Sequence, residues 1–175
     1  MRDHNLAFVD IEATGLNVLR HEIIEIGCVL ATPELGVIEE FEIKIKPERL
    51  EDADPVALKI SQYDAKKWKK SVSLEEAMKL FSDKTKDTIM VGQNIAFDSG
   101  FLEYAFAKTG LQNKMHYHKL DTISIAWAKL HRSPDLIHFS LREMCERFGI
   151  KNKNAHTALS DARATYELYK KLMSL

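Results

Sequence analysis

The first quarter of the chain carries the hydrophobic pattern of β-strands. Residues 6–9 and 23–31 are nearly continuous apolar runs of strand length, and a turn at residues 33–36 separates the second run from residues 37–45. Residues 37–45 alternate, with Phe41, Ile43 and Ile45 on one face and Glu40, Glu42 and Lys44 on the other, which is typical of a strand with one face in the core. The pattern therefore predicts three successive strands, of which the second and third form a hairpin.

Helical patterns dominate from residue 54 onward. Asp54 and Pro55 supply a helix cap followed by proline at the first helical position, and residues 73–76 (SLEE) match a capping box. Residues 88–91 are a short buried strand. Further helices are expected at residues 97–107, 121–130, 140–148 and 157–172. Successive strands followed by alternating strands and helices predict one mixed-sheet α/β domain over residues 1–175.

The composition fits a single globular domain. The 175 residues are 45% hydrophobic and 29% charged, which excludes intrinsically disordered and coiled-coil classes. No apolar run approaches the ~18 residues that span a membrane, and the start of the chain lacks a signal-peptide core, so we expect no membrane association. Cys28 and Cys145 lie in apolar stretches, and we expect them to be reduced thiols of a cytoplasmic protein.

Acidic residues follow the first apolar run at a spacing that the fold alone does not require. Asp10 and Glu12 are two apart, so on a strand they share one face and repel each other unless a cation lies between them. The alternative is a solvated strand end whose acids face water. Asp98 lies at the start of a predicted helix, where an acid also favours the helix dipole. Asn94, just upstream, is a candidate for capping that helix or orienting Asp98.

Asp161 is the most informative acid because it falls on an apolar stripe. The stripe, at helical spacing, consists of Ala158, Asp161, Thr165, Leu168 and Leu172. An ionised acid on a core-facing stripe is costly unless it is paired or binds a metal. His156 precedes Asp161 by a distance that is about 140° around a helix, so we place it in the preceding loop, over the same site. A loop histidine beside clustered acids is a candidate base near neutral pH.

Converging carboxylates at one end of a sheet suit hard, oxygen-preferring cations such as Mg²⁺ or Mn²⁺. Two such ions about 3.5–4 Å apart clamp the attacking and leaving oxygens of a phosphodiester, and a histidine can deprotonate the attacking water. The net charge of −1 argues against a protein that coats nucleic acid by electrostatics alone. It is compatible with an enzyme that grips a few phosphates through metal ions.

Three segments resemble the motifs of DEDD-type 3′–5′ exonucleases. They are residues 10–15 (DIEATG), 91–98 (VGQNIAFD) and 156–162 (HTALSDA), the last in the histidine-bearing DEDDh form. The segments occur in the family's order, and the likeness extends from Leu6 to Leu172. The chain is similar to the polymerase III epsilon-like proofreading exonuclease domain of bacterial replicative polymerases and to free-standing relatives. The resemblance implies an RNase H-like fold with a five-stranded mixed sheet, in which three antiparallel strands are followed by parallel strands.

The resemblance also implies a role for particular residues. Asp10, Glu12 and Asp161 would bind two divalent cations, Mg²⁺ or Mn²⁺, directly. Asp98 would hold the second cation partly through water, and His156 would be the general base. The residues implied at the terminal nucleotide are Ala13, Thr14, Gly15, Leu16, Asn94 and Phe97. The implied reaction is hydrolysis from the 3′ ends of single-stranded DNA or RNA to nucleoside 5′-monophosphates, with a polymerase or another replication or repair protein as a candidate partner.

Two other functions use the same residues. One is a catalytically inactive nucleic-acid-binding or scaffold subunit, although such a protein has no physical reason to keep mutually repelling acids. The other is a metal-dependent nucleotidase or phosphatase that acts on small substrates. The sequence leaves DNA and RNA both open because discrimination of the 2′-hydroxyl leaves no short motif. The oligomeric state is open as well. The end of the chain at Leu175, without a tethering tail, favours a free-standing enzyme.

Several residues outside these motifs carry weaker signals. Residues 66–70 (KKWKK) are candidate contacts for a single strand, but a solvated helix end with Trp68 in the core is the more ordinary expectation. Trp127 is expected in the core, on the apolar side of its helix. Residues 116–118 (HYH) lack further zinc ligands at suitable spacing, which predicts an exposed loop. Glu25, inside the second strand, is expected to form an ion pair or to face solvent.

Overall fold

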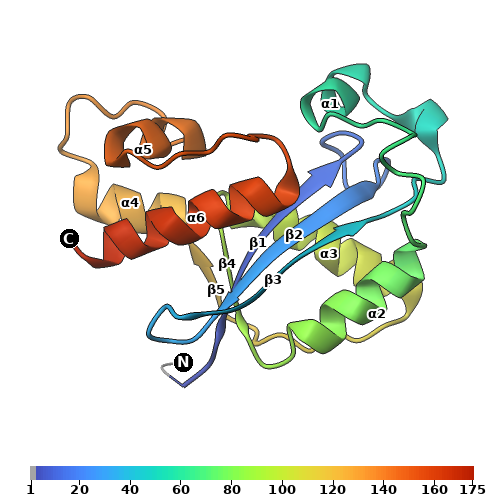
Figure 1. Cartoon of the computed structure of the whole chain (residues 1–175), viewed down its shortest axis with the longest axis horizontal. Coiled ribbons are helices and arrows are strands. Elements are labelled where there is room, and N and C mark those ends of the chain that lie inside the picture. The colour runs from blue at the N-terminus through green and yellow to red at the C-terminus, as the bar shows by residue number, and fades with distance from the viewer. Residues whose placement is uncertain (1–2) are drawn as a thin grey trace.

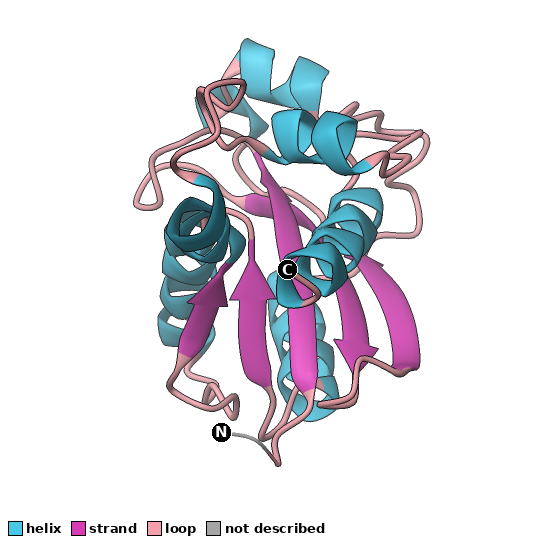
Figure 2. Cartoon of the chain, turned by 90° about the vertical axis from the view of Figure 1, so that its left-hand side faces the viewer, coloured by secondary structure: helices cyan, strands magenta, loops and turns pink. Residues whose placement is uncertain are grey.

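The computed structural model describes residues 3–175 and contains a five-stranded sheet with helices on both faces (Figures 1 and 2). The strands are β1 (Leu6–Ala13), β2 (Ile23–Ala31), β3 (Val37–Lys44), β4 (Ile89–Gly92) and β5 (Lys119–Asp121). Their order in the sheet is β3-β2-β1-β4-β5. The first three strands pair antiparallel, whereas β4 and β5 join in parallel. The predicted mixed sheet is therefore confirmed.

Helices fill the intervals that the sequence patterns predicted. They are η1 (Leu50–Asp52), α1 (Pro55–Ile60), α2 (Leu74–Lys84), α3 (Ile95–Thr109), α4 (Thr122–Leu130), α5 (Leu141–Phe148) and α6 (Ala158–Met173). The capping box at Ser73 and Glu76 is formed, and Asp54 caps α1 ahead of Pro55. None of the helices in the described part of the chain is long and apolar enough to cross a membrane.

Alternate residues of β1 face two different helix layers. Val9 and Ile11 belong to a core cluster with α2 and α3, whereas Phe8 packs against α6. Because side chains alternate along a strand, Asp10 and Glu12 continue the face that Phe8 begins. The two carboxylates are therefore directed toward the α6 side of the sheet, where the apolar cluster around Phe8 gives way to polar residues.

The carboxylate of Asp121, at the end of β5, accepts hydrogen bonds from the first turns of two helices, α3 and α4. Asp121 was expected as the first residue of a helix; it ends β5 and caps α4 by accepting a hydrogen bond from the backbone N of Ile123 (2.8 Å). It also accepts a hydrogen bond from the backbone N of Ile95, the first residue of α3 (3.2 Å). Asn94, a candidate for capping α3 or orienting Asp98, stands at the N-cap position of α3 in a left-handed conformation (φ 59°), but its side chain makes no capping bond.

The two tryptophans have opposite environments. Trp68 is buried, as expected, and its Nε1 donates a hydrogen bond to the carbonyl of Ile24 (2.9 Å). Trp127 was expected in the core but is 57% exposed. The difference arises because the small residue Ala126 supplies the fully buried contact of α4, while the Trp127 ring rests at the surface beside Phe139, with ring centroids 5.2 Å apart.

Two other expectations hold. Glu25 forms the expected ion pair, with its carboxylate 3.3 Å from Nζ of Lys44, and it is fully buried rather than facing solvent. Residues 116–118 lie in the loop before β5, and Tyr117 in the middle of this loop is exposed.

Helix α6 lies directly on the backbone of β2 at Gly27. A Cβ added at Gly27 would lie 2.1 Å from the carbonyl carbon of Ala158 and 2.2 Å from the backbone N of Leu159, far inside van der Waals contact. Gly27 is also the residue of β2 that lies opposite Asp10 of β1. The missing side chain at Gly27 therefore allows the first turn of α6, with Asp161, to sit over the acidic end of β1.

We expect Gly27→Ala to lower the free energy of unfolding by about 1–3 kcal/mol, because the new methyl group must displace the first turn of α6. The matched control is Gly100→Ala in α3, where an added Cβ meets nothing within 4 Å. That control should instead stabilise the protein by about 0.5–1 kcal/mol through helix propensity. Urea denaturation of both variants measures the difference. Equal stability of Gly27→Ala and the native chain would contradict the close packing.

Candidate active site

Asp10 and Glu12 form one side of the candidate site. Both are half-buried near the end of β1, and in the pairing with β2 Glu12 lies opposite Glu25. Among the described residues, neither carboxylate takes part in a salt bridge. The predicted same-face arrangement is therefore present, and it places like charges together without a protein cation to balance them.

Asp98 joins the site from α3. It lies in the first turn of that helix, as predicted, and is only 3% exposed. Its Oδ1 accepts a hydrogen bond from the backbone N of Ile11 (2.9 Å), the residue between Asp10 and Glu12. This bond links the start of α3 to the end of β1 and fixes the orientation of a carboxylate that is almost removed from water.

Asp161 enters the site from the first turn of α6. The whole stripe on which it lies is buried, as the helical spacing predicted. Its Oδ2 accepts a hydrogen bond from the backbone N of His156 (3.0 Å), and its Oδ1 accepts one from the side-chain amide of Asn152. Ser160 donates its hydroxyl to Oδ1 of Asn152 (2.7 Å), which orients that amide. Sequence reasoning missed Asn152, because a polar loop residue has no periodicity that would single it out.

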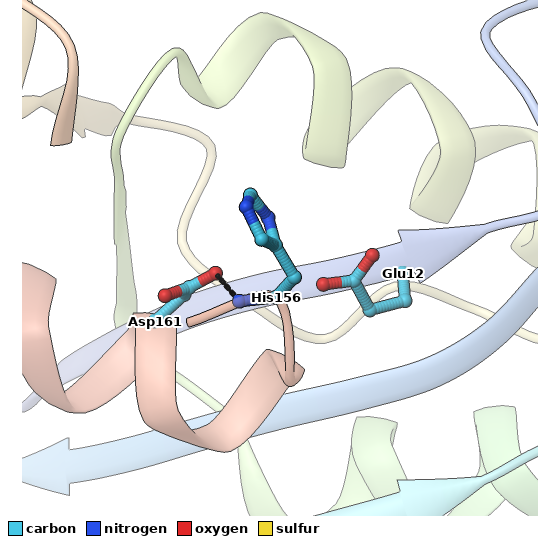
Figure 3. A group of neighbouring side chains, drawn as sticks. All are labelled: Glu12, His156 and Asp161. Atoms are coloured by element: carbon cyan, nitrogen blue, oxygen red, sulfur yellow. Dashed lines mark hydrogen bonds between the residues drawn. The ribbon is translucent and has the colours of Figure 1, made fainter. Parts of the chain in front are cut away.

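Glu12, His156 and Asp161 form a compact group (Figure 3). Each offers one ligand atom, and these atoms all lie within 4.8 Å of one another. His156 precedes α6, as predicted. Its side chain is exposed, and its backbone is in the left-handed conformation (φ 66°). Such a conformation is uncommon for a residue with a side chain, and it persists only where the surroundings hold it. Here the bond from the backbone N of His156 to Asp161 provides that constraint.

The loop that carries His156 is also held from the opposite side. The side-chain amide of Gln62, just after α1, donates a hydrogen bond to the carbonyl of Ala155 (3.1 Å). Gln62 itself has a left-handed backbone (φ 53°). The contact joins residues far apart in the sequence, so nothing in the local pattern could have indicated it.

Burial raises the pKa values of three carboxylates, those of Asp10, Glu12 and Asp98. Burial first, and then the charges of Asp161 and Asp98, raise the pKa of Glu12 to about 7. Burial likewise raises the pKa of Asp98 to about 7, although backbone hydrogen bonds act in the other direction. Burial and the neighbouring carboxylates hold the pKa of Asp10 well above its usual range. The site is therefore an accumulation of negative charge that a bound cation would relieve.

The loop after β1 extends the site outward. The hydroxyl oxygen of Thr14 accepts a hydrogen bond from the backbone N of Glu22 (2.9 Å), which closes the base of the loop. A Cβ at Gly15 would lie 2.4 Å from the imidazole of His21, so only glycine allows this ring to pack there. Leu16 is 82% exposed at the tip. A large apolar side chain exposed on the loop that follows Glu12 is suited to contact a flat apolar ligand group.

The remaining residues implied at the terminal nucleotide lie at the same end of the sheet. Ala13 is the last residue of β1 and is buried. Asn94 is exposed just before α3, and Phe97 is half-buried in its first turn, with its ring 4.9 Å from that of Phe101. Asn94 and Phe97 therefore precede Asp98 at the start of α3, while Ala13 follows Glu12.

The sequence matches the RNase T-type exonuclease family over residues 7–169, so the chain belongs to this exonuclease family, and its motifs are of the DEDDh form. It is an exonuclease domain whose sequence is similar to DNA polymerase III proteins, both PolC-type polymerases and an epsilon subunit. Its five-stranded sheet has the RNase H-like fold of the structures it resembles.

Particular relatives show how much of a longer protein such a domain occupies. The chain is 30% identical over 166 residues to the PolC-type DNA polymerase III of Caldanaerobacter subterraneus, covering 94% of this chain and 11% of that polymerase. It is 28% identical over 179 residues to the DNA polymerase III epsilon subunit of Aquifex aeolicus, covering 98% and 81%. The structure of E. coli exonuclease I with a dT13 oligonucleotide has a TM-score of 0.83 at 19% identity, covering 98% of this chain and 41% of that one.

We expect the chelated protein to lose stability as the pH rises. The pKa of Glu12 is raised from 4.5 to about 7, so the folded state binds more protons than the unfolded chain between these values. The free energy of unfolding should therefore fall as the pH rises through this window. Asp10→Asn removes one of the repelling charges and should raise the Tm by about 2–4 °C near pH ~8, but hardly change it near pH ~5. Thermal denaturation with chelator, followed by circular dichroism, tests this, and a destabilised variant near pH ~8 would contradict it.

Proposed function

We propose that the chain is a metal-dependent 3′–5′ exonuclease that releases nucleoside 5′-monophosphates from single-stranded nucleic acid. The observation that carries this proposal is the compact group of Glu12, His156 and Asp161, with Asp10 on the same strand face and Asp98 tied to the same strand. Membership of the exonuclease family supports the class of reaction. The proposal takes residues 1–175 as a single exonuclease domain.

The donor atoms fit two divalent cations that prefer oxygen ligands. Asp10, Glu12 and Asp161 would hold the cations directly, and Asp98 would support the second one. Carboxylate oxygens are the ligands that Mg²⁺ and Mn²⁺ prefer, and the raised pKa values of Glu12 and Asp98 mark charge that no protein cation balances. Bound there, the cations would supply Lewis-acid polarisation of the phosphodiester and activation of the attacking water.

His156 would act as the general base for the attacking water. Its imidazole is exposed at the mouth of the site, while its backbone N is fixed to Asp161 (3.0 Å). This arrangement fixes the backbone and leaves the ring nitrogens available for a proton. Histidine is the side chain that most often serves as a general base.

The loop after β1 would receive the 3′ end. The backbone of Ala13, Thr14 and Gly15 would approach the terminal 3′-hydroxyl, and the exposed Leu16 would contact the terminal base. Phe97, beside Asp98, would pack on the other side, with Asn94 at the margin. These contacts need a free, unpaired end, which favours single strands over duplex.

Relatives indicate candidate partners. E. coli exonuclease I has been solved with single-stranded DNA and with the C-terminal segment of SSB, and the epsilon relative is a subunit of DNA polymerase III. By analogy, we infer single-stranded 3′ ends as substrates of this chain in the cytoplasm, and a polymerase or repair protein as its partner. Digestion of matched DNA and RNA oligonucleotides would decide between the two nucleic acids.

Chelator should abolish release of mononucleotides from a 5′-labelled single strand, and added Mg²⁺ or Mn²⁺ should restore it, because the carboxylates need cations to bind the phosphodiester. The product ladder should shorten stepwise from the 3′ end. A circular single strand is the control and should resist digestion. Full activity in excess chelator, or equal cutting of the circle, would disprove the proposal. Preferential hydrolysis of free nucleotides would instead indicate a nucleotidase.

We expect His156→Asn to lower kcat by about 10²–10⁴-fold, the usual contribution of a positioned general base. Asparagine tolerates the left-handed backbone at this position, so the loop and its bond to Asp161 should survive. The ascending limb of the pH–rate profile should flatten. Binding of Mn²⁺, measured by titration, should change little. A loss of Mn²⁺ affinity as large as the loss of rate would show that His156 is a metal ligand rather than the base.

A further inference from the structure

Four lysines lie together on an exposed turn without acidic partners. We call residues 64–70 the lysine turn; its cations are Lys66, Lys67, Lys69 and Lys70, all exposed. Within residues 3–175 none of the four takes part in a salt bridge, whereas Lys44 and Lys84 pair with glutamates. The acid inside the turn, Asp64, instead accepts a hydrogen bond from the backbone N of Lys66 (2.8 Å). The turn therefore presents an unbalanced positive charge.

The lysine turn is anchored rather than loose. Trp68 at its centre is 6% exposed and donates its Nε1 hydrogen to the carbonyl of Ile24 in β2 (2.9 Å). Nζ of Lys44 lies 4.5 Å from the centroid of the Trp68 ring, and the ring of Tyr63 lies 5.1 Å away. Trp68 is therefore a core residue, as the sequence predicted. Because Trp68 is fixed to β2, the lysines on either side of it have a fixed position as well.

This fixed position is at the same end of the molecule as the candidate active site. Ile24, which anchors Trp68, precedes Glu25, and Glu25 lies opposite Glu12 across β1 and β2. Gln62, shortly before the turn, donates a hydrogen bond to the carbonyl of Ala155, next to His156. Figure 1 shows α1 beyond the arrowhead end of β1, the end of the strand near which α6 begins. Two independent contacts therefore place the lysine turn at the margin of the acidic site.

A cationic margin beside an acidic centre suits an extended polyanion. The chain has a net charge of only −1, so attraction for phosphates must come from local groups. Exposed lysines can neutralise phosphates of a single strand without reading its sequence. We propose that the lysine turn binds the phosphate backbone of the single strand upstream of the 3′ end that the active site holds. This inference rests on the proposed function and assigns a second contact surface for the same substrate.

The test compares two fourfold variants that lose the same charge. One carries Lys66→Gln, Lys67→Gln, Lys69→Gln and Lys70→Gln. The matched control neutralises exposed lysines that lie outside the turn and form no salt bridge among the described residues. Four of these are chosen, Lys79, Lys86, Lys129 and Lys171, and each is changed to Gln. The probe is a fluorescent oligothymidine of about 20 nucleotides, longer than the ~4–16 nucleotides that a single binding fold covers. Its affinity is measured by anisotropy in chelator, where no hydrolysis occurs, at several salt concentrations.

We expect the lysine-turn variant to bind the probe about tenfold more weakly at low salt than the native chain. The slope of log affinity against log salt should fall by about 0.7 for each phosphate that the variant no longer neutralises. The control should keep most of the affinity and the slope. In Mg²⁺, the ratio of kcat/KM for the long strand to that for a dinucleotide should fall in the lysine-turn variant. Equal weakening in the two variants, or no weakening in either, would overturn the inference. Absence of hydrolysis by the native chain would count against the proposed function, while the binding result still decides the role of the lysine turn.

Discussion

The structure depends on how closely α6 approaches the sheet at Gly27. The backbone of Ala158 and Leu159 occupies the place where a side chain of β2 would stand, so the first turn of α6 rests on the strand itself. In the same register Gly27 lies opposite Asp10, so this contact brings Asp161 toward the acids of β1. The loop before α6 is held near this contact by two hydrogen bonds. The backbone N of His156 donates one to Asp161, and the side-chain amide of Gln62 donates the other to the carbonyl of Ala155.

The site is an unfavourable arrangement that the rest of the fold sustains. Burial raises the pKa values of Glu12 and Asp98 to about 7, and neighbouring carboxylates add to the shift, Asp161 and Asp98 at Glu12 and Asp121 at Asp98. The folded chain therefore holds carboxylates where charge is costly. The surrounding structure leaves them little freedom to move apart. Asp98 is fixed to the backbone of Ile11, and Asp121 fixes the start of the helix that carries Asp98. Strain of this kind persists only where a well-packed core offsets it, and it is concentrated where a cation and a phosphodiester would bind.

Charge is separated along this end of the molecule. The centre is acidic, which suits cations and would by itself repel phosphates, and the lysine turn at its margin carries unpaired positive charge. Trp68 connects the two regions, because it anchors the turn on the β2 residue next to Glu25. The exonuclease domain in such relatives can form a small part of a polymerase, as with the PolC-type protein of which this chain spans 11%. A surface within the domain that binds the substrate would serve such a domain both inside a polymerase and as a separate protein.

The sequence alone determined those features that follow from local periodicity and from neighbouring residues. Two-residue alternation placed Asp10 and Glu12 on one strand face, helical spacing placed Asp161 on a buried stripe, and the motifs carried the resemblance that defined the fold. Only the tertiary structure decided contacts between distant segments. It made the carboxylate of Asp121, rather than the side chain of Asn94, the acceptor at the start of α3. It also exposed Trp127 and joined Gln62 to Ala155. The physical reason is that capping, exposure and loop support depend on which elements meet in space, and such meetings leave no signal in the spacing of residues along one element.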